Sequence, residues 1–230
     1  MTNTAIRKEV DVRGITRLCH FTPSRNLVHI ATDPRGLLAT KHLLSDERAA
    51  FNSTDLERMD GQLDHICCSV QYPNAWYFRK ARSEDKVFKD WVVLLIASEC
   101  LFRNGVKFCP RNAAAGRGRY LGESIDAFRA MFAETVEGAG NRRYTRGPNH
   151  PGFLPTDEQA EVLIPDNITP SEVLGLAVAD ASQARREQAR FRLLKADAPP
   201  IYIAPSFFDA VQLSRLLRAG KTPEEATYLG

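Results

Sequence analysis

Hydrophobic positions along the chain form short continuous runs, separated by segments with one-sided helical spacing. The strongest run covers residues 91–97 and contains no polar residue, which predicts a central strand buried on both faces. Shorter apolar runs predict further strands over residues 18–21, 66–70, 174–178 and 201–204, and one that begins at Glu161.

Apolar residues at spacings of three and four predict the helices. The clearest helix is expected over residues 123–137, with Gly138 at its end. A basic helix is expected over residues 181–194. Capping residues predict three more helices, which begin at Ser24, at Ser206 (burying Phe207, Val211 and Leu217) and at Thr222-Pro223-Glu224-Glu225.

Short strands mixed with helices indicate an α+β fold. The chain has no internal repeat and no long low-complexity linker, so residues 1–230 are expected to form a single domain. Residues 138–156 are rich in Gly, Asn, Pro and Arg, which predicts a loop between the helix and the strand at Glu161.

Composition narrows the class of protein without assigning a function. The hydrophobic share of 43% and net charge of +3 fit a soluble globular protein, although the arginines are locally clustered. No apolar stretch reaches the roughly 20 residues that span a bilayer, and the N-terminus has no apolar signal region. Five cysteines, an odd number, indicate thiols in a reducing compartment. A cytoplasmic protein, without membrane attachment and without a metal site, is expected.

Glu161 begins an apolar run, where a carboxylate usually has a partner or a function. Gln159-Ala160-Glu161 has the Gln-x-Glu form that NAD-consuming transferases use to activate a nucleophile beside a ribose. An ordinary glutamate at a strand edge is the alternative. Near the end of the first predicted strand, His20 and Thr22 share one face. They could bind a nucleotide, or serve as a core histidine and a helix cap.

Three further segments carry side chains suited to a nucleotide. Arg58 could grip a diphosphate through its planar guanidinium, or form a surface ion pair. The aromatic residues within 72–78 could stack on a nicotinamide or a base, or belong to the core. Residues 112–120 resemble a phosphate-binding loop in composition, but match neither the P-loop nor the GxGxxG pattern.

The segment before Glu161 concentrates cations around an aromatic residue. Arginines suit the phosphates of a single-stranded nucleic acid, and a tyrosine can stack on a base. A solvated, flexible loop is the alternative. The expected nucleic-acid-binding residues are Arg142, Arg143, Tyr144, Arg146 and His150.

Taken in order, these segments resemble the DarT family of toxin DNA ADP-ribosyltransferases. The ordered set carries the resemblance, over roughly residues 15–205, because no single motif in it is specific. The matching residues are His20-Phe21-Thr22, Asn26-Leu27, Gly36-Leu37, Asn52, Arg58, Asp60, Tyr72-Pro73-Asn74, Asn112-Ala113-Ala114 and Gln159-Ala160-Glu161.

The resemblance implies an ADP-ribosyltransferase fold, in which a split, strongly bent β core with flanking helices holds NAD in a central cleft. It implies that Arg58 and Glu161 are the catalytic residues and that residues 138–156 recognise the acceptor. NAD is then the co-substrate. The expected NAD-binding residues are His20, Thr22, Asn26, Gly36, Tyr72 and Tyr77.

The hypothesis that follows is transfer of ADP-ribose from NAD to a nucleobase of single-stranded DNA. Glu161 would hold the ribose 2′-hydroxyl and accept a proton from the base, while Arg58 would fix the diphosphate or orient the base. Related enzymes modify thymine or guanine in DNA, or messenger RNA in antiviral (phage) defence. Residues 138–156 are richer in arginine and glycine than in the thymine-modifying branch, and the Asn52…Arg58-x-Asp60 and Tyr72-Pro73-Asn74 patterns favour an acceptor other than thymine. The resemblance also implies a DarG-type macrodomain antitoxin as partner.

Two other classes of function remain open at the level of sequence. A Gln-x-Glu motif also occurs in toxins that ADP-ribosylate arginine, so the acceptor could be a protein. A non-catalytic nucleic-acid-binding module would use its arginines for phosphates, and Glu161 would then be structural. Such a module would bind oligonucleotides without consuming NAD.

Overall fold

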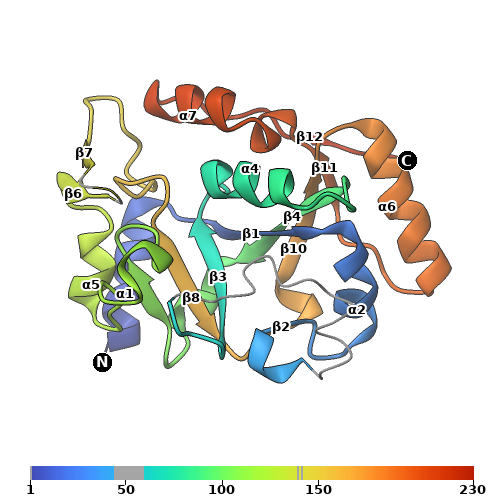
Figure 1. Ribbon diagram of the computed structural model, residues 1–230, viewed down its shortest axis with the longest axis horizontal. Helices are drawn as coiled ribbons and strands as arrows, with labels where there is room; N and C mark the ends of the chain where they lie inside the picture. Colours follow the sequence, from blue (N-terminus) through green and yellow to red (C-terminus); the bar gives the residue numbers. More distant parts are fainter. Residues whose placement is uncertain (1, 44–59, 139, 141) are drawn as a thin grey trace.

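The computed structural model describes residues 2–43, 60–138, 140 and 142–230 (Figure 1). The predicted catalytic residue Arg58 lies outside the described residues. The helices are α1 (Thr2–Arg13), α2 (Leu27–Thr32), α4 (Ala75–Glu84), α5 (Ile125–Ala130), α6 (Ala181–Leu194) and α7 (Ala210–Arg218). The strands are β1 (Arg17–Pro23), β2 (Leu37–Leu38), β3 (His65–Val70), β4 (Trp91–Ala97), β5 (Lys107–Cys109), β6 (Thr135–Glu137), β7 (Arg143–Thr145), β8 (Glu161–Pro165), β9 (Asn167–Ile168), β10 (Val173–Val178), β11 (Ile201–Ile203) and β12 (Ala226–Thr227).

Eight strands form one mixed sheet, in the order β12-β11-β10-β4-β1-β3-β8-β5. β4 lies between β1 and β10, antiparallel to both, and every residue of β4 is buried. This central position explains the continuous apolar run of residues 91–97. β10 and β11 are parallel and are joined through α6, as a parallel pair requires a crossover. The predicted α+β class is confirmed.

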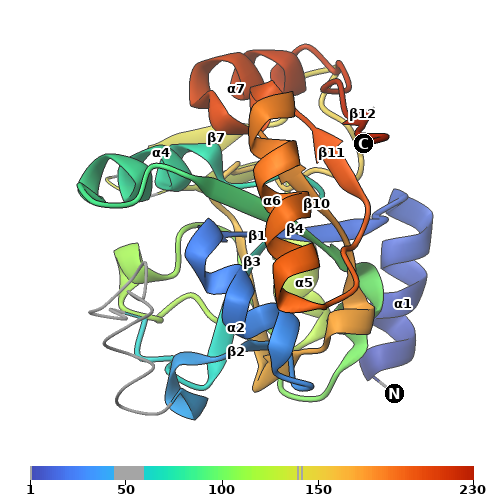
Figure 2. The ribbon, with the colours of Figure 1, turned by 90° about the vertical axis from the view of Figure 1, so that its right-hand side faces the viewer.

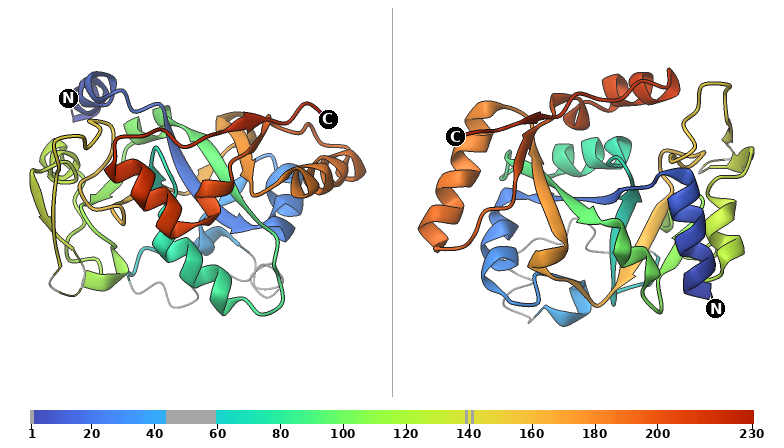
Figure 3. Two further views of the ribbon diagram at one scale, coloured as in Figure 1. Left: turned by 90° about the horizontal axis from the view of Figure 1, so that it is seen from above. Right: turned by 180° about the vertical axis from the view of Figure 1, so that it is seen from behind.

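The two faces of the sheet carry separate apolar clusters. Alternate side chains of β4 point to opposite faces, with Val92 and Leu94 in one cluster and Val93 and Leu95 in the other. α1, α2, α5 and α6 pack against the first cluster, and α4 and α7 against the second. Figure 2 shows α6 and α2 stacked at one end of the sheet, and Figure 3 shows α7 lying along α4.

The sheet is split between β1 and β3. These strands pair at only two positions, Leu18 with Val70 and Cys19 with Ser69, whereas β1 pairs with β4 along its full length. Beyond Cys19 the strands diverge, and in Figure 1 β3 runs steeply away from β1. The divergence leaves space between the two strands, and the candidate site lies there.

Several elements match the pattern of the sequence closely. β4 and α6 begin and end at the predicted residues. β3, β10 and β11 differ from the predicted strands by one residue at one end, and β8 begins at Glu161 as expected. The element predicted from Ser24 is two pieces, a 3-10 turn over Ser24–Asn26 followed by α2. No helix of the described chain is long and apolar enough to cross a membrane.

The prediction of a helix over residues 123–137 is wrong after residue 130. α5 ends at Ala130, and the chain then turns into β6, which pairs with β7. Phe132 and Val136 are each only 6% exposed, but a turn and a strand bury them in place of a helix. Apolar spacing alone could not distinguish these two ways of burying the same residues. Residues 138–156 accordingly include a strand, β7, and are not all loop.

The helix predicted from Ser206 starts later than expected. Ser206 belongs to a 3-10 helix, Pro205–Phe208, and Asp209 caps α7 instead, because its Oδ1 accepts hydrogen bonds from two backbone amides. Leu217 faces the core as predicted, but Val211 is 59% exposed. The three-residue shift rotates the helix relative to the predicted face.

The short helix predicted at Thr222 does not form, and the extended strand β12 follows it. Arg17 donates two hydrogen bonds of 2.6 Å to the carboxylate of Glu225. This bidentate ion pair holds the segment against the sheet, and it outweighs the local capping preference of Thr222-Pro223.

Candidate active site

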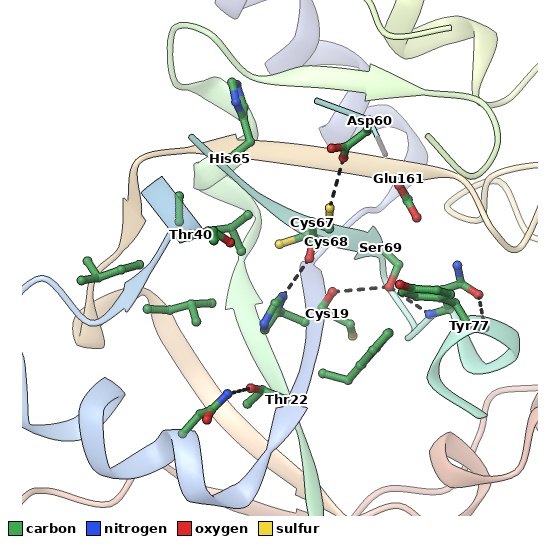
Figure 4. Close-up of a pocket in the computed structure, with 18 of the residues that line it drawn as sticks. Cys19, Thr22, Thr40, Asp60, His65, Cys67, Cys68, Ser69, Tyr77 and Glu161 are labelled. Atoms are coloured by element: carbon green, nitrogen blue, oxygen red, sulfur yellow. Dashed lines mark hydrogen bonds between the residues drawn. The ribbon is translucent and has the colours of Figure 1, made fainter. Parts of the chain in front are cut away.

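A cavity opens where β1 and β3 separate (Figure 4). It encloses about 1180 Å³, counting its open mouth. Its walls come from β1, α2, β2, β3 and the start of α4, together with the segment after β5 and the first residue of β8. Of the predicted NAD-binding and catalytic residues, those that line it are His20, Thr22, Asn26, Tyr77 and Glu161.

His20 lies on β1 just beyond the last pair with β3. Its Nδ1 lies 2.8 Å from the carbonyl oxygen of Cys67 on β3. A carbonyl can only accept, so Nδ1 carries the hydrogen in this contact. If the β1–β3 pairing continued, Phe21 would lie opposite Cys67. The strands have separated there, and the carbonyl oxygen of Cys67 is bonded by the His20 ring. His20 therefore bonds across the split in the sheet.

Thr22 and Asn26 form the next part of the wall. Asn26 Nδ2 donates a hydrogen bond of 2.8 Å to Thr22 Oγ1. Asn26 Oδ1 is buried and has no hydrogen-bond partner among the residues that the structure describes. A buried acceptor without a donor is costly, which marks a place where a ligand hydroxyl or amide would be favourable.

α4 begins at the opposite side of the cavity, where Asn74 caps it. Asn74 Oδ1 accepts a 3.1 Å hydrogen bond from the backbone N–H of Tyr77. The backbone N–H of Asn74 donates to Ser69 Oγ at 3.1 Å. Asn74 Nδ2 is buried without a partner within the described chain. The Tyr77 ring lies beside Phe21, with centroids 6.0 Å apart. This wall therefore offers a donor and an aromatic face.

Glu161 is held firmly at the edge of the cavity. Its Oε1 accepts a 2.8 Å hydrogen bond from Asn112 Nδ2, and its Oε2 accepts one of 3.1 Å from the Ala113 amide. The residue is 8% exposed. Pairing of Cys109 with Glu161 places the segment after β5 beside the carboxylate. The two donors fix the orientation of the carboxylate toward the cavity that it lines.

Gly36 and Tyr72 lie outside this cavity. Gly36 has φ +75°, and a Cβ there would lie 2.3 Å from the carbonyl oxygen of Ile168, so the position requires glycine. Its neighbour Leu37 lines the cavity in its place. Tyr72 is 6% exposed and packs edge-on against Phe207, 5.7 Å away. It lines a second, smaller cavity.

The predicted nucleic-acid-binding residues divide into two groups. Arg142 and Arg143 are exposed, and Tyr144 is half-buried. The Tyr144 ring lies so close to Gly138 that a Cβ there would approach within 2.2 Å of it. We name residues 135–145, the β6–β7 pair and its connection, the basic hairpin; the described part of it presents exposed cations beside a ring.

Arg146 and His150 face inward instead. The Arg146 guanidinium donates to the carbonyl oxygens of Leu154 and Pro151, at 2.9 and 2.7 Å. His150 Nε2 lies 3.1 Å from the carbonyl oxygen of Pro155. Burial, reinforced by the charge of Arg146, lowers the pKa of His150, so the ring is neutral at physiological pH. These two side chains hold the loop together.

A buried polar pair lies at the base of the basic hairpin. Asp157 is 1% exposed; its Oδ1 accepts from the Gln159 amide at 2.9 Å, while Oδ2 has no partner in the described chain. Burial raises the pKa of Asp157 to about 6. Arg111, 8% exposed, bonds the Gly138 carbonyl and lowers that pKa through its charge. Asp157 directly precedes the turn into Glu161.

Some cavity residues were not predicted as site residues. Asn74 and Asn112 belong to the family resemblance, but nothing in the sequence assigned them a contact. Ser69 and His65 carry no local signal, because a serine and a histidine on a buried strand are common. His65 bonds Asp64 and the Gly105 carbonyl, at 2.7 and 3.0 Å. Only the pairing of distant strands brings these residues together.

Within the described residues, no group of three or more His, Cys, Asp or Glu side chains could hold a metal ion. The polar side chains of the cavity are hydroxyls, amides, histidines and carboxylates, and they lie among apolar residues of α2 and β2 and the rings of Phe21 and Tyr77. This mixture suits a nucleotide with its hydroxyls, amide groups and ring systems.

Comparison with known proteins places this geometry in a family. The DarT family, described as ssDNA thymidine ADP-ribosyltransferase, matches residues 19–209. No curated protein matches the chain. Thermus sp. 2.9 DarT in complex with ADP-ribosylated ssDNA is similar in structure, with a TM-score of 0.58, 15% identity, and coverage of 85% of this chain and 97% of that chain.

Two further structures show the same likeness. Thermus sp. 2.9 DarT in complex with NAD⁺ has a TM-score of 0.55 at 16% identity, covering 84% of this chain and 97% of that chain. Thermosipho africanus DarTG in complex with ADP-ribose has a TM-score of 0.52 at 14% identity, covering 84% of this chain and 51% of that chain. At such identities the likeness shows the fold, and the predicted ADP-ribosyltransferase fold is confirmed. Because the family match spans most of its length, the chain belongs to the DarT family of NAD-dependent ADP-ribosyltransferases that act on single-stranded DNA.

Proposed function

We propose that this chain transfers ADP-ribose from NAD to a thymine base of single-stranded DNA, and that Glu161 receives the proton of that base. One observation carries the proposal: two hydrogen-bond donors fix the Glu161 carboxylate at the wall of the cavity between β1 and β3. Thymidine is the acceptor in the family's description, which outweighs the preference for another base drawn from the sequence patterns.

The cavity fits NAD in its chemistry, because its wall combines polar groups that need partners with an aromatic ring. Asn26 Oδ1 needs a donor and Asn74 Nδ2 needs an acceptor. The ribose hydroxyls and the carboxamide of NAD can supply both. Tyr77 offers its ring to a planar group, and His20 and Thr22 complete the polar wall.

Glu161 performs the proton transfer in the proposed reaction. The nicotinamide–ribose bond breaks and nicotinamide leaves with the bonding electrons, while a ring nitrogen of the base bonds to the anomeric carbon. The base loses its N–H proton in this step, and the Glu161 carboxylate accepts it. Asn112 and the Ala113 amide keep the carboxylate oriented throughout.

Arg58 is the second proposed catalytic residue, on the strength of the family resemblance. A guanidinium bound to the diphosphate would neutralise its charge and hold NAD in a reactive orientation. Arg58→Ala is expected to raise the KM for NAD and to lower kcat. Arg58→Lys is expected to recover part of this loss, because it restores the charge without the planar fork.

The basic hairpin is the proposed contact for the acceptor strand. Arg142 and Arg143 are exposed and can pair with phosphates, and Tyr144 can support a base. A single strand suits this site, because a base within a duplex must first leave the stack to be modified. Arg146 and His150, in contrast, would shape the loop that presents these contacts.

We extend the proposal to the cellular setting of the enzyme. A DarG-type macrodomain protein would act as its antitoxin and remove ADP-ribose; the likeness to Thermosipho africanus DarTG supports this pairing. A role in antiviral defence and a cytoplasmic location agree with an enzyme that needs both NAD and DNA. All five cysteines are free thiols in the structure.

The decisive test is Glu161→Ala with NAD and oligonucleotides that each contain one kind of base. Transfer measured by mass spectrometry is expected to fall by about 10²–10⁴-fold, the usual contribution of a general base. NAD affinity, measured by calorimetry, is expected to change little. Glu224→Ala, the same substitution at an exposed site, serves as the matched control.

Three results would contradict the proposal. They are labelling of DNA by Glu161→Ala at the wild-type rate, labelling of bases other than thymine by the wild-type protein, and labelling of RNA or protein in preference to DNA. Parallel reactions with RNA oligonucleotides and with a protein extract separate the last possibility from the first two.

A further inference from the structure

We propose that Glu158 is a positioning residue, which ties α4 and α7 to the segment that carries Glu161. This inference rests on the proposed catalytic role of Glu161. Glu158 is not among the residues of the family resemblance, and it does not line the main cavity. It would act on the reaction only through the placement of Glu161.

Glu158 receives hydrogen bonds from two helices at once. Its Oε2 accepts from Trp76 Nε1 on α4 at 3.1 Å. Its Oε1 accepts from Ser214 Oγ at 2.8 Å and from Arg218 Nε at 2.9 Å, both on α7. The side chain of Glu158 is 20% exposed, and its bonds to Trp76 and Ser214 are partly buried, whereas the Arg218 side chain is 61% exposed. Three donors therefore hold one carboxylate in a single orientation.

The distance along the chain from this junction to the catalytic carboxylate is very short. Only Gln159 and Ala160 separate Glu158 from Glu161, and Ala160 is 1% exposed. Its amide donates to the Asp157 carbonyl at 3.0 Å, which closes a tight turn. A tight turn of two residues, of which Ala160 is buried, transmits a displacement at Glu158 along the chain with little change in its length. A shift there would consequently move Glu161.

The same junction connects the two sides of the cavity. Trp76 immediately precedes Tyr77, which lines the cavity from α4, whereas Glu161 lines it from the start of β8. Glu158 therefore fixes the start of α4 relative to the start of β8. Because a bond must form between groups held by these two sides, their separation affects the reaction more than it affects the fold.

α7 gains a role from this arrangement. The helix lies after residue 209, where the family match ends. Leu213 and Leu217 bury its inner face, and Ser214, 6% exposed, lies between them. A helix needed for packing alone would not require a buried hydroxyl and an arginine aimed at one carboxylate. We infer that α7 acts as a brace for the catalytic segment.

The test removes the donors on α7. The double variant Ser214→Ala/Arg218→Ala is expected to lower kcat for transfer about tenfold, as misplaced catalytic groups do, with KM for NAD within about twofold of the wild type. Arg218→Lys is expected to recover much of the Arg218→Ala loss. Arg215→Ala, the same change at an exposed position of α7, is the matched control.

A second variant distinguishes positioning from packing. Trp76→Phe keeps an aromatic ring but removes the Nε1 donor. If Glu158 joins the two helices, combining Trp76→Phe with Arg218→Ala will reduce kcat by a factor different from the product of the single effects. The inference is overturned if kcat matches that of Arg215→Ala in all these variants while only the urea midpoint falls. A wild-type protein without transfer activity would instead contradict the proposed function.

Discussion

The β1–β3 cavity wall and the basic hairpin use polar side chains in opposite ways. In the wall, the polar groups are buried, and two of them, Asn26 Oδ1 and Asn74 Nδ2, lack partners within the described chain. In the hairpin, Arg142 and Arg143 are exposed to solvent. Buried groups without partners bind a ligand whose hydrogen-bonding atoms match them in position, whereas exposed cations attract any nearby anion.

This difference separates the two substrates physically. The wall should select NAD by hydrogen bonds in fixed directions, with little dependence on salt. The hairpin should attract a polyanion through charge, with a strong dependence on salt. Not every basic residue of this segment is free to contact DNA. Arg146 and His150 both donate to carbonyl oxygens of their own loop and so stabilise it.

The largest expected effect in this comparison concerns Asp157, at the base of the hairpin. Its buried carboxylate is expected to destabilise the fold at neutral pH. Burial raises the pKa of Asp157 from the ordinary 3.8 to about 6. The folded state thus binds this proton more tightly than the unfolded state, so the contribution to stability is complete at low pH and is lost as pH rises through 6. The free energy of unfolding of Asp157→Asn relative to wild type is expected to rise by about 2 kcal/mol from pH 4.5 to pH 7.5.

Urea unfolding at the two pH values measures this change. The asparagine keeps an oxygen for the Gln159 amide, so the turn remains capped. Asp197→Asn, at an exposed position, is the control for charge removal alone. A pH-independent difference between Asp157→Asn and the wild type would show that the buried carboxyl does not titrate in this range.

The second effect concerns the wall. Asn26→Ala removes the acceptor without a partner and is expected to raise the KM for NAD about tenfold, the cost of one hydrogen bond with a buried group. Steady-state transfer at saturating DNA measures it, and the increase should persist between 50 and 300 mM salt. Asn104→Ala at an exposed turn is the control. An unchanged KM would remove Asn26 from the NAD site.

The smallest effect concerns the hairpin. Arg142→Ala/Arg143→Ala is expected to weaken single-stranded DNA binding about fivefold at 150 mM salt, and to reduce the slope of log K against log salt by about 1.4, since each phosphate contact contributes about 0.7. Fluorescence anisotropy measures both values. NAD affinity should not change. If the variant binds DNA with the wild-type slope, the acceptor strand does not pass over the hairpin, and the comparison fails on that side.

The sequence was sufficient for elements whose burial is uniform or strictly periodic. β4 is buried on both faces, and α6 has a capping Asp180 and a regular inner face, so their limits follow from local pattern. Phe132 and Val136 show where this kind of prediction fails. Their spacing continues that of the helix, but a turn and a strand bury them. The conformation of the segment at Thr222 depends on the contact of Glu225 with Arg17, more than 200 residues away in sequence.

The site was predictable in part for a similar reason. His20, Thr22 and Glu161 stand at strand positions that local pattern and family resemblance both mark, and the structure brings them into one cavity. Tyr72 could not be separated from Tyr77, because only the path of the chain from β3 into α4 places one ring in the second cavity and the other in the first. The support that Asn112 gives to Glu161 depends on strand pairing across about 50 residues.

Gly36 has a consequence for how divergent relatives are recognised. Any larger residue would place an atom 2.3 Å from the Ile168 carbonyl oxygen, at a φ of +75° that side chains rarely adopt. Glycine there would survive evolutionary drift even in a descendant that had lost its enzymatic activity. Gly36 therefore reports on the path of the backbone, whereas a loss of catalysis would appear first at Glu161.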